Sequence, residues 1–207
     1  MNESANLITS IDRLEEVYGP VNPTSVDKES GWITPEYREL IEASPFLALA
    51  TTGPGGLDCS PRGDAGSAVT VIDERTVHLA DRRGNNRLDS LRNIVLDSHV
   101  ALLFLIPGIN ECMRINGRAV LSTAPELLEQ HAHDGKAPRS VIVVTVDVVY
   151  FQCARAIKRS EIWNVDRQVE RSSLPTPGEI MIALTKGKFD GVAYEAELQT
   201  RQADTLY

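Results

Sequence analysis

The sequence predicts a mainly β protein with flanking helices (α+β), built as a closed or nearly closed antiparallel barrel. Three observations predict this class. Short apolar and β-branched runs recur with turn residues between them, and strands and helices do not alternate regularly as they would around a parallel sheet. With 207 residues, the chain is also long enough for one domain with its own core.

The predicted strands share a high content of Val, Ile, Leu, Thr and aromatic residues. They are Phe46–Thr52, Leu57–Ser60, Val69–Ile72, Thr76–Leu79, Val100–Ile106, Met113–Ser122 and Val141–Phe151. Asp73-Glu74-Arg75 predicts a hairpin turn between two of these runs. Asn116-Gly117 lies inside another run and predicts a bulge or kink rather than a chain reversal.

Helices are predicted before, between and after these strands. Apolar residues at helical spacing predict one over residues 7–17, which Gly19-Pro20 ends. Thr34-Pro35-Glu36 supplies an N-cap, a Pro at the first helical position and an acid in the first turn, so a helix is expected to about residue 43. Residues 188–207 are polar and predict a frayed helix or tail. Two capping boxes predict further helix starts, at Thr123-Ala124-Pro125-Glu126 and Thr176-Pro177-Gly178-Glu179.

Net charge and cysteine content exclude several classes of protein. The chain carries 21 basic and 29 acidic residues, for a net charge of −8, which argues against a general nucleic-acid or membrane-surface binder. No apolar run approaches the length of a membrane-spanning helix, and no signal peptide precedes residue 17. Cys59, Cys112 and Cys153 show neither CxxC nor metal-ligand spacing, so we expect a cytoplasmic protein with no disulfides and no metal site.

The main candidate for chemistry is a basic turn between a strand and a helix. Arg82, Arg83, Arg87 and Arg92 lie within eleven residues of this acidic chain. Helix N-termini bind anions through free N–H groups, and guanidinium forks match the paired oxygens of a phosphate. We expect Asn85 or Asn86 to cap the helix, and Leu88, Leu91 and Val95 to face inward. The alternative is a solvated helix start with ion pairs among Arg82, Arg87, Asp81 and Asp89.

Two other basic clusters follow strands and could meet at the same pocket. One is Ser60-Pro61-Arg62-Gly63-Asp64, which alone is better explained as a tight turn with an Arg62–Asp64 ion pair. The other runs from Arg155 to Trp163, and its simpler interpretation is an exposed basic turn with Trp163 covering an edge of the core. The three clusters together predict an anion site more strongly than any one of them does.

The common catalytic motifs are missing. The chain has no Walker loop, no GxSxG and no HExxH. Cys59 is expected to be a buried, inert strand residue, and His131 and His133 are expected on an exposed helix end. If the protein is an enzyme, a bound cofactor is expected to carry the reaction.

Five segments resemble the FMN-binding proteins related to pyridoxamine 5'-phosphate oxidase, in particular a bacterial branch expected to be FMN-dependent enzymes. The resemblance covers about residues 34–163 in unbroken order. It implies a split β-barrel of antiparallel Greek-key type and a homodimer with FMN at the interface. The segments are Ser60–Asp64, Asp81–Arg87, Phe104–Gly108, Arg114–Ala119 and Arg159–Trp163.

The resemblance also implies roles for individual residues. Asn86 and Arg87 occupy the positions that grip the FMN phosphate, and Arg159, Ser160 and Trp163 would lie near the flavin, reaching it from the partner subunit. The full set implied to bind the cofactor is Ser60, Pro61, Arg62, Asp81, Arg82, Arg83, Asn85, Asn86, Arg87, Arg159, Ser160 and Trp163. The chain departs from the branch at Ala80, Gln152 and Arg155, where Pro, His and Lys are common, and no acid or base is assigned.

The resulting hypothesis is an FMN-dependent oxidoreductase acting on a small molecule. One domain is expected over residues 1–207, with an N-terminal helix and loop over 1–33, the barrel over 34–163 and a helical extension over 164–207. The alternative is a non-catalytic module that binds, stores or senses a flavin or haem, although no axial His for haem is evident. The true oxidase's contacts to its vitamin B6 phosphate cannot be matched, so that substrate is not carried over.

Overall fold

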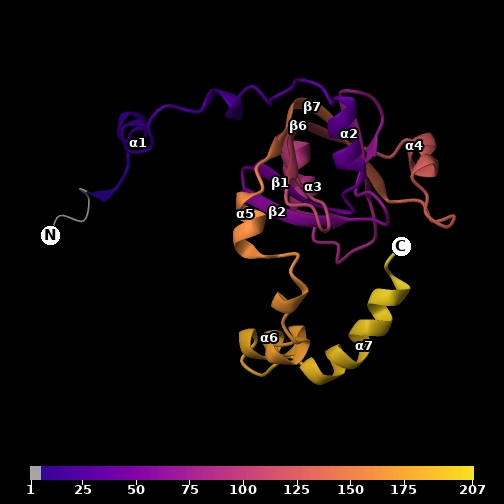
Figure 1. The fold of residues 1–207 in the computed structure, drawn as a ribbon. Coiled ribbons are helices and arrows are strands. Elements are labelled where there is room, and N and C mark those ends of the chain that lie inside the picture. The colour runs from indigo at the N-terminus through magenta and orange to yellow at the C-terminus, as the bar shows by residue number, and fades with distance from the viewer. Residues whose placement is uncertain (1–5) are drawn as a thin grey trace.

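One antiparallel sheet forms the body of the protein in the computed structural model, which describes residues 6–207 (Figure 1). Its strands are β1 (Phe46–Gly53), β2 (Gly56–Gly63), β3 (Thr70–Val71), β4 (Thr76–Asp81), β5 (His99–Leu105), β6 (Cys112–Ser122) and β7 (Ser140–Gln152). They hydrogen-bond in the order β2-β1-β5-β6-β7-β4-β3. Over the described residues no ladder joins the edge strands β2 and β3. The predicted antiparallel class is therefore confirmed, but the barrel is not closed.

Helices flank this sheet and extend beyond both of its ends. They are α1 (Ile11–Tyr18), α2 (Pro35–Glu42), α3 (Asp89–Leu96), α4 (Pro125–Gln130), α5 (Arg155–Ser160), α6 (Pro177–Leu184) and α7 (Gly191–Asp204), with 3-10 turns η2 (Pro23–Ser25), η3 (Val165–Arg167) and η4 (Arg171–Ser173). Thr34 caps α2 and Thr176 closes a capping box on α6, as predicted. None of the described helices is long and apolar enough to cross a membrane.

The core lies between the curled sheet and helices α2 and α3. Alternate residues of β1 point inward, so Leu47 and Leu49 are fully buried against Phe104 of β5. Ile41 closes the core from α2 and Ile94 from α3. The β6–β7 pairing shifts register between Asn116 and Gly117, where the sequence predicts a bulge or kink, but the extra residue is Asp147 on β7, between the partners Val146 and Val148.

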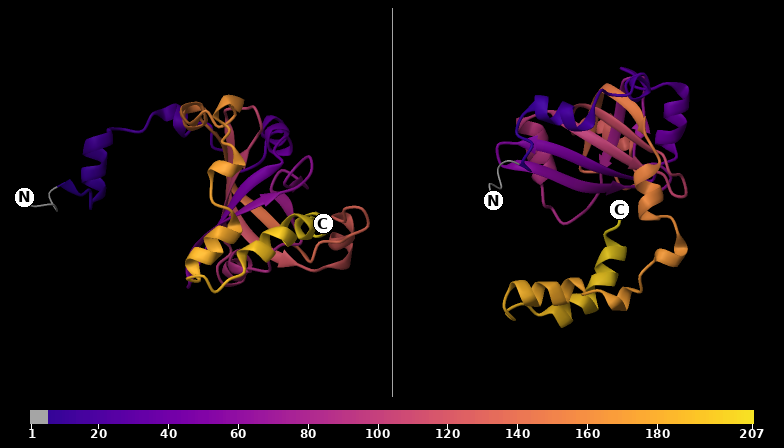
Figure 2. Two further views of the ribbon diagram at one scale, coloured as in Figure 1. Left: turned by 90° about the horizontal axis from the view of Figure 1, so that it is seen from below. Right: turned by 60° about the vertical axis from the view of Figure 1, so that its left-hand side comes forward.

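Three expectations about helices were wrong. The predicted first helix is present and ends at Gly19 as expected, but α1 begins at Ile11 rather than at Leu7. Its apolar side chains are all exposed, because an extended segment holds it away from the sheet (Figures 1 and 2). Thr123 forms no capping box, since Ala124 is the N-cap residue of α4 and has no side-chain acceptor to offer. Neither Asn85 nor Asn86 caps α3, because the helix begins one turn later, with Leu88 at the N-cap.

The inward face of α3 was also predicted wrongly. Leu88 and Val95 are exposed and Leu91 is half-buried, whereas Ser90 and Asn93 are buried. Asn93 faces inward because its side-chain amide donates a hydrogen bond to Thr51 Oγ1 on β1 at 3.1 Å. A hydrogen bond of this kind stabilises a buried polar group that a purely apolar pattern would place outside.

The surroundings of Cys59 and His131 differ from prediction as well. Cys59 is exposed because β2 is an edge strand and the thiol lies on the face opposite Asp58 and Ser60. His131 is buried because its ring turns inward to pair with His78 of β4, with Nε2 3.0 Å from His78 Nδ1. His133 is partly exposed.

Candidate functional site

A cavity of about 410 Å³ lies between β2, the end of β4 and the beginning of α3. Nine of the twelve residues proposed for the cofactor line it. They are Ser60, Pro61, Arg62, Asp81, Arg82, Arg83, Asn85, Asn86 and Arg87. Two of the three basic clusters recognised in the sequence thus meet at one place.

The floor of the cavity is the irregular segment 82–88 between β4 and α3. Asn86 adopts the left-handed conformation with φ of 58°, which Asn tolerates better than most residues. The Asn85 side chain accepts a hydrogen bond from the Arg87 N–H at 3.0 Å, and no side chain caps α3. The first N–H groups of α3 therefore remain available beside the cavity, where they favour an anion.

Three of the arginines are paired with carboxylates inside the chain. Arg62 contacts Asp81 at 2.6 Å and Arg82 contacts Asp64 at 2.8 Å. The simpler interpretation paired Arg62 with Asp64 inside one cluster and placed Asp81 and Arg82 in ion pairs inside the other. In the structure each ion pair instead joins the two clusters, because Arg62 of β2 pairs with Asp81 of β4, and Arg82 after β4 pairs with Asp64 after β2. Arg87 pairs with Asp89 at 2.5 Å, as that interpretation expected.

Other donors around the cavity have no such partner. Among residues 6–207 Arg83 forms no ion pair, and Arg62 Nε is buried without a hydrogen-bond acceptor. The Arg139 guanidinium donates to the neutral side-chain oxygen of Asn86 at 2.5 Å. Cationic donors without an acceptor fit an anionic or oxygen-rich molecule in the cavity.

Asp58 anchors the opposite wall through two hydroxyl groups. Ser90 and Ser60 both donate to its carboxylate, the latter at 2.8 Å. These hydrogen bonds lower the pKa of Asp58, with smaller help from the charges of Arg87 and Arg62. Ser60 Oγ also lies 3.0 Å from Ser90 Oγ, so Ser60 contacts α3 as well as lining the cavity.

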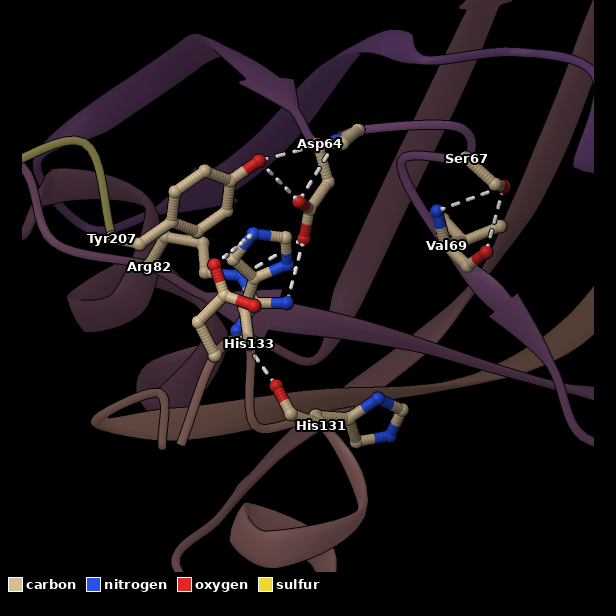
Figure 3. Close-up of polar contacts among 9 residues, drawn as sticks. Asp64, Ser67, Val69, Arg82, His131, His133 and Tyr207 are labelled. Carbon is tan, nitrogen blue, oxygen red and sulfur yellow. Dashed lines mark hydrogen bonds and ion pairs between the residues drawn. The ribbon is translucent and has the colours of Figure 1, made fainter. Parts of the chain in front are cut away.

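Asp64, Arg82 and Tyr207 form a second cluster at the rim (Figure 3). The Tyr207 hydroxyl donates to Asp64 at 3.0 Å, and Arg82 also donates to the backbone oxygen of His131 at 2.6 Å. Burial acts to raise the pKa of Asp64, but the hydrogen bonds from Arg82 and Tyr207 outweigh it and lower that pKa. Asp64 therefore stays ionised and holds the Arg82 guanidinium in place.

The remaining three proposed residues lie apart from this cavity. Arg159 and Ser160 end α5, where Ser160 Oγ donates to the backbone oxygen of Ile157 at 3.0 Å. The Trp163 indole donates to the backbone oxygen of Ile109 at 2.8 Å. That they reach the cavity of a partner subunit stays a prediction.

Sequence reasoning missed several residues of the site. Asp58 could have been found from its alternation with Ser60 on β2, which places both side chains on one face. Arg139 and Tyr207 carry no local signal, because they are far from the basic turn in sequence. No cluster of three metal-ligating side chains occurs in the described part of the chain.

Comparison with known proteins gives a family match over much of the chain. A family model described as pyridoxamine 5'-phosphate oxidase matches residues 33–153. No curated protein matches the sequence.

Several solved structures are similar to part of this chain at low sequence identity. HupZ of Group A Streptococcus is 19% identical, with a TM-score of 0.45 over 57% of this chain and 93% of that one. An FMN-binding protein from Syntrophomonas wolfei is 12% identical, with a TM-score of 0.42 over 68% and 97%. A protein from Clostridium acetobutylicum related to general stress protein 26, of the pyridoxinephosphate oxidase family, is 14% identical, with a TM-score of 0.44 over 56% and 85%.

Proposed function

The chain belongs to the pyridoxamine 5'-phosphate oxidase family, and on that premise we propose that it binds FMN in the 410 Å³ cavity and acts as an oxidoreductase on a small molecule. The observation that carries the proposal is the set of unpartnered cationic donors at this cavity, Arg83 and the Nε of Arg62. The cavity also falls within the range of about 300–1,000 Å³ usual for cofactor sites.

The residues present fit a phosphate at one end of the cavity. Arg83, Asn86 and Arg87 would hold it together with the free N–H groups of α3. Arg62 would offer its buried Nε to a cofactor oxygen nearer to β2. Asp81 and Asp64 would hold Arg62 and Arg82 in orientation. Neither carboxylate would occupy Arg83 or the Nε of Arg62, which stay free for the cofactor.

These contacts give the cofactor and the protein separate roles. FMN supplies the electron-transfer chemistry when it is bound, and the protein supplies binding and orientation. Asp58 and Asp64 both have lowered pKa values, so they serve as fixed negative charges rather than as proton donors at neutral pH. We assign no residue as a general acid or base.

The first test is the absorbance spectrum of the purified protein, followed by FMN titration of the unloaded protein. We expect flavin bands, and we expect Arg83→Ala to raise the Kd for FMN about ten-fold or more, the effect of losing one charge-assisted hydrogen bond. The matched control is Arg92→Ala, because Arg92 is exposed on α3 outside the cavity lining.

Three outcomes would contradict the proposal. A colourless protein that binds no FMN, or one with the Soret band of haem, would refute the cofactor. Equal losses for Arg83→Ala and Arg92→Ala would refute the site. A protein that binds FMN but shows no reduction by NADH or NADPH in stopped flow, and no turnover with other donors or acceptors, would be a flavin-binding module rather than an oxidoreductase.

A further inference from the structure

The C-terminal helices α6 and α7 lie outside the sheet, and the chain after α7 turns back towards it (Figures 1 and 2). Among residues 6–207, every hydrogen bond between residues 171–207 and residues 6–160 is made by Tyr207. Burial agrees with this, since residues 201–206 are exposed whereas Tyr207 is partly buried. Hydrogen bonds therefore attach the C-terminal helices to the body at one residue, at the rim of the candidate cofactor cavity.

Tyr207 is held by contacts from three parts of the chain (Figure 3). Its hydroxyl donates to Asp64 at 3.0 Å and accepts from the N–H of Ala65 at 3.4 Å, just after β2. Its ring stacks on His133, in the segment after α4, with centroids 3.8 Å apart and 17° between the ring planes. The ring centroid lies 5.5 Å from the guanidinium carbon of Arg82, just after β4. The hydroxyl and the ring of Tyr207 are thus both fixed by the fold.

These contacts converge on the side chain of Arg82. Its Nε and Nη2 each lie 2.8 Å from one carboxylate oxygen of Asp64, and its Nη1 donates to the backbone oxygen of His131 at 2.6 Å. All three guanidinium nitrogens have protein acceptors, so Arg82 acts as an anchor within the protein. The side chains of Arg82 and Asp64 are only 18% and 16% exposed, and Tyr207 contacts both. An ion pair shielded in this way is screened less by solvent than a surface pair.

Arg82 anchors the start of the segment to which the proposed function assigns the cofactor phosphate. This segment, residues 82–88, is neither helix nor strand, so its path depends on the side chains that tie it down. Arg83, Asn86 and Arg87, which would hold the phosphate, all follow Arg82 within five residues. Donors contribute most to binding where their positions are set before the ligand arrives. The contacts of Arg82 therefore affect phosphate binding although its own nitrogens already have acceptors.

We propose that Tyr207 is a positioning residue of the FMN site, because it holds the Asp64–Arg82 ion pair and thereby fixes the path of residues 82–88. The inference rests on the proposed function, which places the FMN phosphate at that segment. Tyr207 does not line the candidate cofactor cavity, so its effect reaches the cofactor through Asp64 and Arg82. Linkage makes the coupling reciprocal, so bound FMN is expected to strengthen the attachment of the C-terminal helices.

The first test compares FMN affinity among variants of Tyr207, with circular dichroism to confirm that each variant is folded. Tyr207→Ala is expected to raise the Kd for FMN about three-fold to thirty-fold, the range for a residue that acts through others. Tyr207→Phe keeps the ring contacts and loses only the hydroxyl, so a smaller loss is expected. In the Asp64→Ala background, Tyr207→Phe is expected to change the Kd no further, because the hydroxyl acts through Asp64. Leu206→Ala, at the exposed neighbouring residue, is the matched control and is expected to leave the Kd unchanged.

The second test needs no cofactor, because it follows the order of residues 82–88 by limited trypsin digestion of the unloaded protein. Arg83 and Arg87 are exposed in this segment, and cleavage after the exposed Arg13 of α1 gives an internal reference. Relative to that reference, Tyr207→Ala is expected to speed cleavage within residues 82–88 about three-fold or more, whereas Leu206→Ala is not. In the wild-type protein, added FMN is expected to slow the same cleavages.

Each other outcome has a definite meaning. An unchanged Kd for FMN in Tyr207→Ala, or an equal loss in Leu206→Ala, would overturn the proposal. Full additivity of Tyr207→Phe and Asp64→Ala would overturn it as well, because the hydroxyl would then act independently of the ion pair. A protein that takes up no FMN would refute the proposed function. In that case faster cleavage in Tyr207→Ala would still support the positioning of residues 82–88 by Tyr207, and unchanged cleavage would refute it.

Discussion

His78 and His131 form a buried pair beneath the site. Their rings meet edge to face with centroids 5.2 Å apart, and the backbone oxygen of His131 accepts from Arg82. Burial lowers the pKa of both imidazoles. The charge of Asp73 opposes this lowering at His78, whereas those of His78 and Arg82 add to it at His131. The pair therefore lies directly behind Arg82, whose guanidinium lines the candidate cofactor cavity.

The stability of the protein is expected to fall as the pH drops below the ordinary histidine pKa of 6.5. In that range the unfolded chain takes up protons that the folded pair resists, so the free energy of unfolding decreases by at most about 1.4 kcal/mol per pH unit for each proton. Above pH 6.5 the two imidazoles are mainly neutral in both the folded and the unfolded chain. In that range the histidine pair adds almost no pH dependence to the free energy of unfolding. Urea unfolding at a series of pH values measures the slope.

His78→Gln is expected to flatten this slope between pH 5 and 6.5, even if the variant is less stable throughout. His99→Gln serves as the control, because that ring is exposed and lacks a buried partner. An unchanged slope in His78→Gln would show that the pair does not couple stability to pH.

Strands β6 and β7 form the longest ladder of the sheet, and Gly117 determines how they fit together. At the bulge, a Cβ on Gly117 would lie 2.2 Å from the backbone oxygen of Thr145 on β7. Backbone atoms cannot move aside as the end of a flexible side chain can. The position therefore requires glycine because of the close approach of two strands.

Gly117→Ala is expected to lower the free energy of unfolding by about 1–3 kcal/mol, the usual cost of forcing extra atoms into a packed interior. Chemical denaturation followed by circular dichroism measures it. Gly55→Ala is the matched control in the β1–β2 turn, where a Cβ would meet nothing within 4 Å. Similar stabilities for the two variants would refute the close-contact argument.

Elements with strong local signals were predictable from the sequence. The strands, the Thr34 and Thr176 helix starts and the register shift at Asn116-Gly117 all follow from neighbouring residues. The buried face of α3 was not predictable, because the burial of Asn93 depends on Thr51, far away in the chain. Thr123-Ala124-Pro125-Glu126 failed as a capping box for a local reason, because Ala124 takes the N-cap position and has no side-chain acceptor.

The candidate site was predictable in its location but not in its charge balance. The basic turn and the cluster around Arg62 meet at one cavity, as the resemblance implied. The ion pairs of Arg62 and Arg82 cross between β2 and β4, and such pairing between strands has no local signature in sequence. The sequence alone therefore does not tell which guanidinium groups lack a carboxylate partner; the folded structure does.

At the scale of the whole molecule, helices α1, α6 and α7 lie outside the body formed by the sheet (Figure 2). α6 and α7 pack on each other, and their backbones lie in close contact at Gly178 and Gly191. They nonetheless leave apolar side chains in contact with solvent, as α1 does. These include Ile11, Val17, Ile180, Leu184 and Val192. Exposed apolar groups of this kind favour burial against another chain.

We expect a homodimer in solution, with a mass twice the 22.7 kDa of one chain by sedimentation equilibrium. If FMN lies at the interface, Arg159→Ala is expected to weaken FMN binding although Arg159 does not line its own cavity. Lys158→Ala, on the same helix, is the control. A 22.7 kDa species that binds FMN normally would exclude an interfacial cofactor.

The two edges of the open sheet bear on how the protein avoids aggregation. A free edge can recruit a strand from another molecule and so begin a fibril. β3 offers only two residues for such pairing, and β2 contains Pro61, which has no N–H to donate. Neither edge therefore presents a continuous row of hydrogen-bonding groups, so the barrel can remain open without acting as a template for intermolecular strand addition.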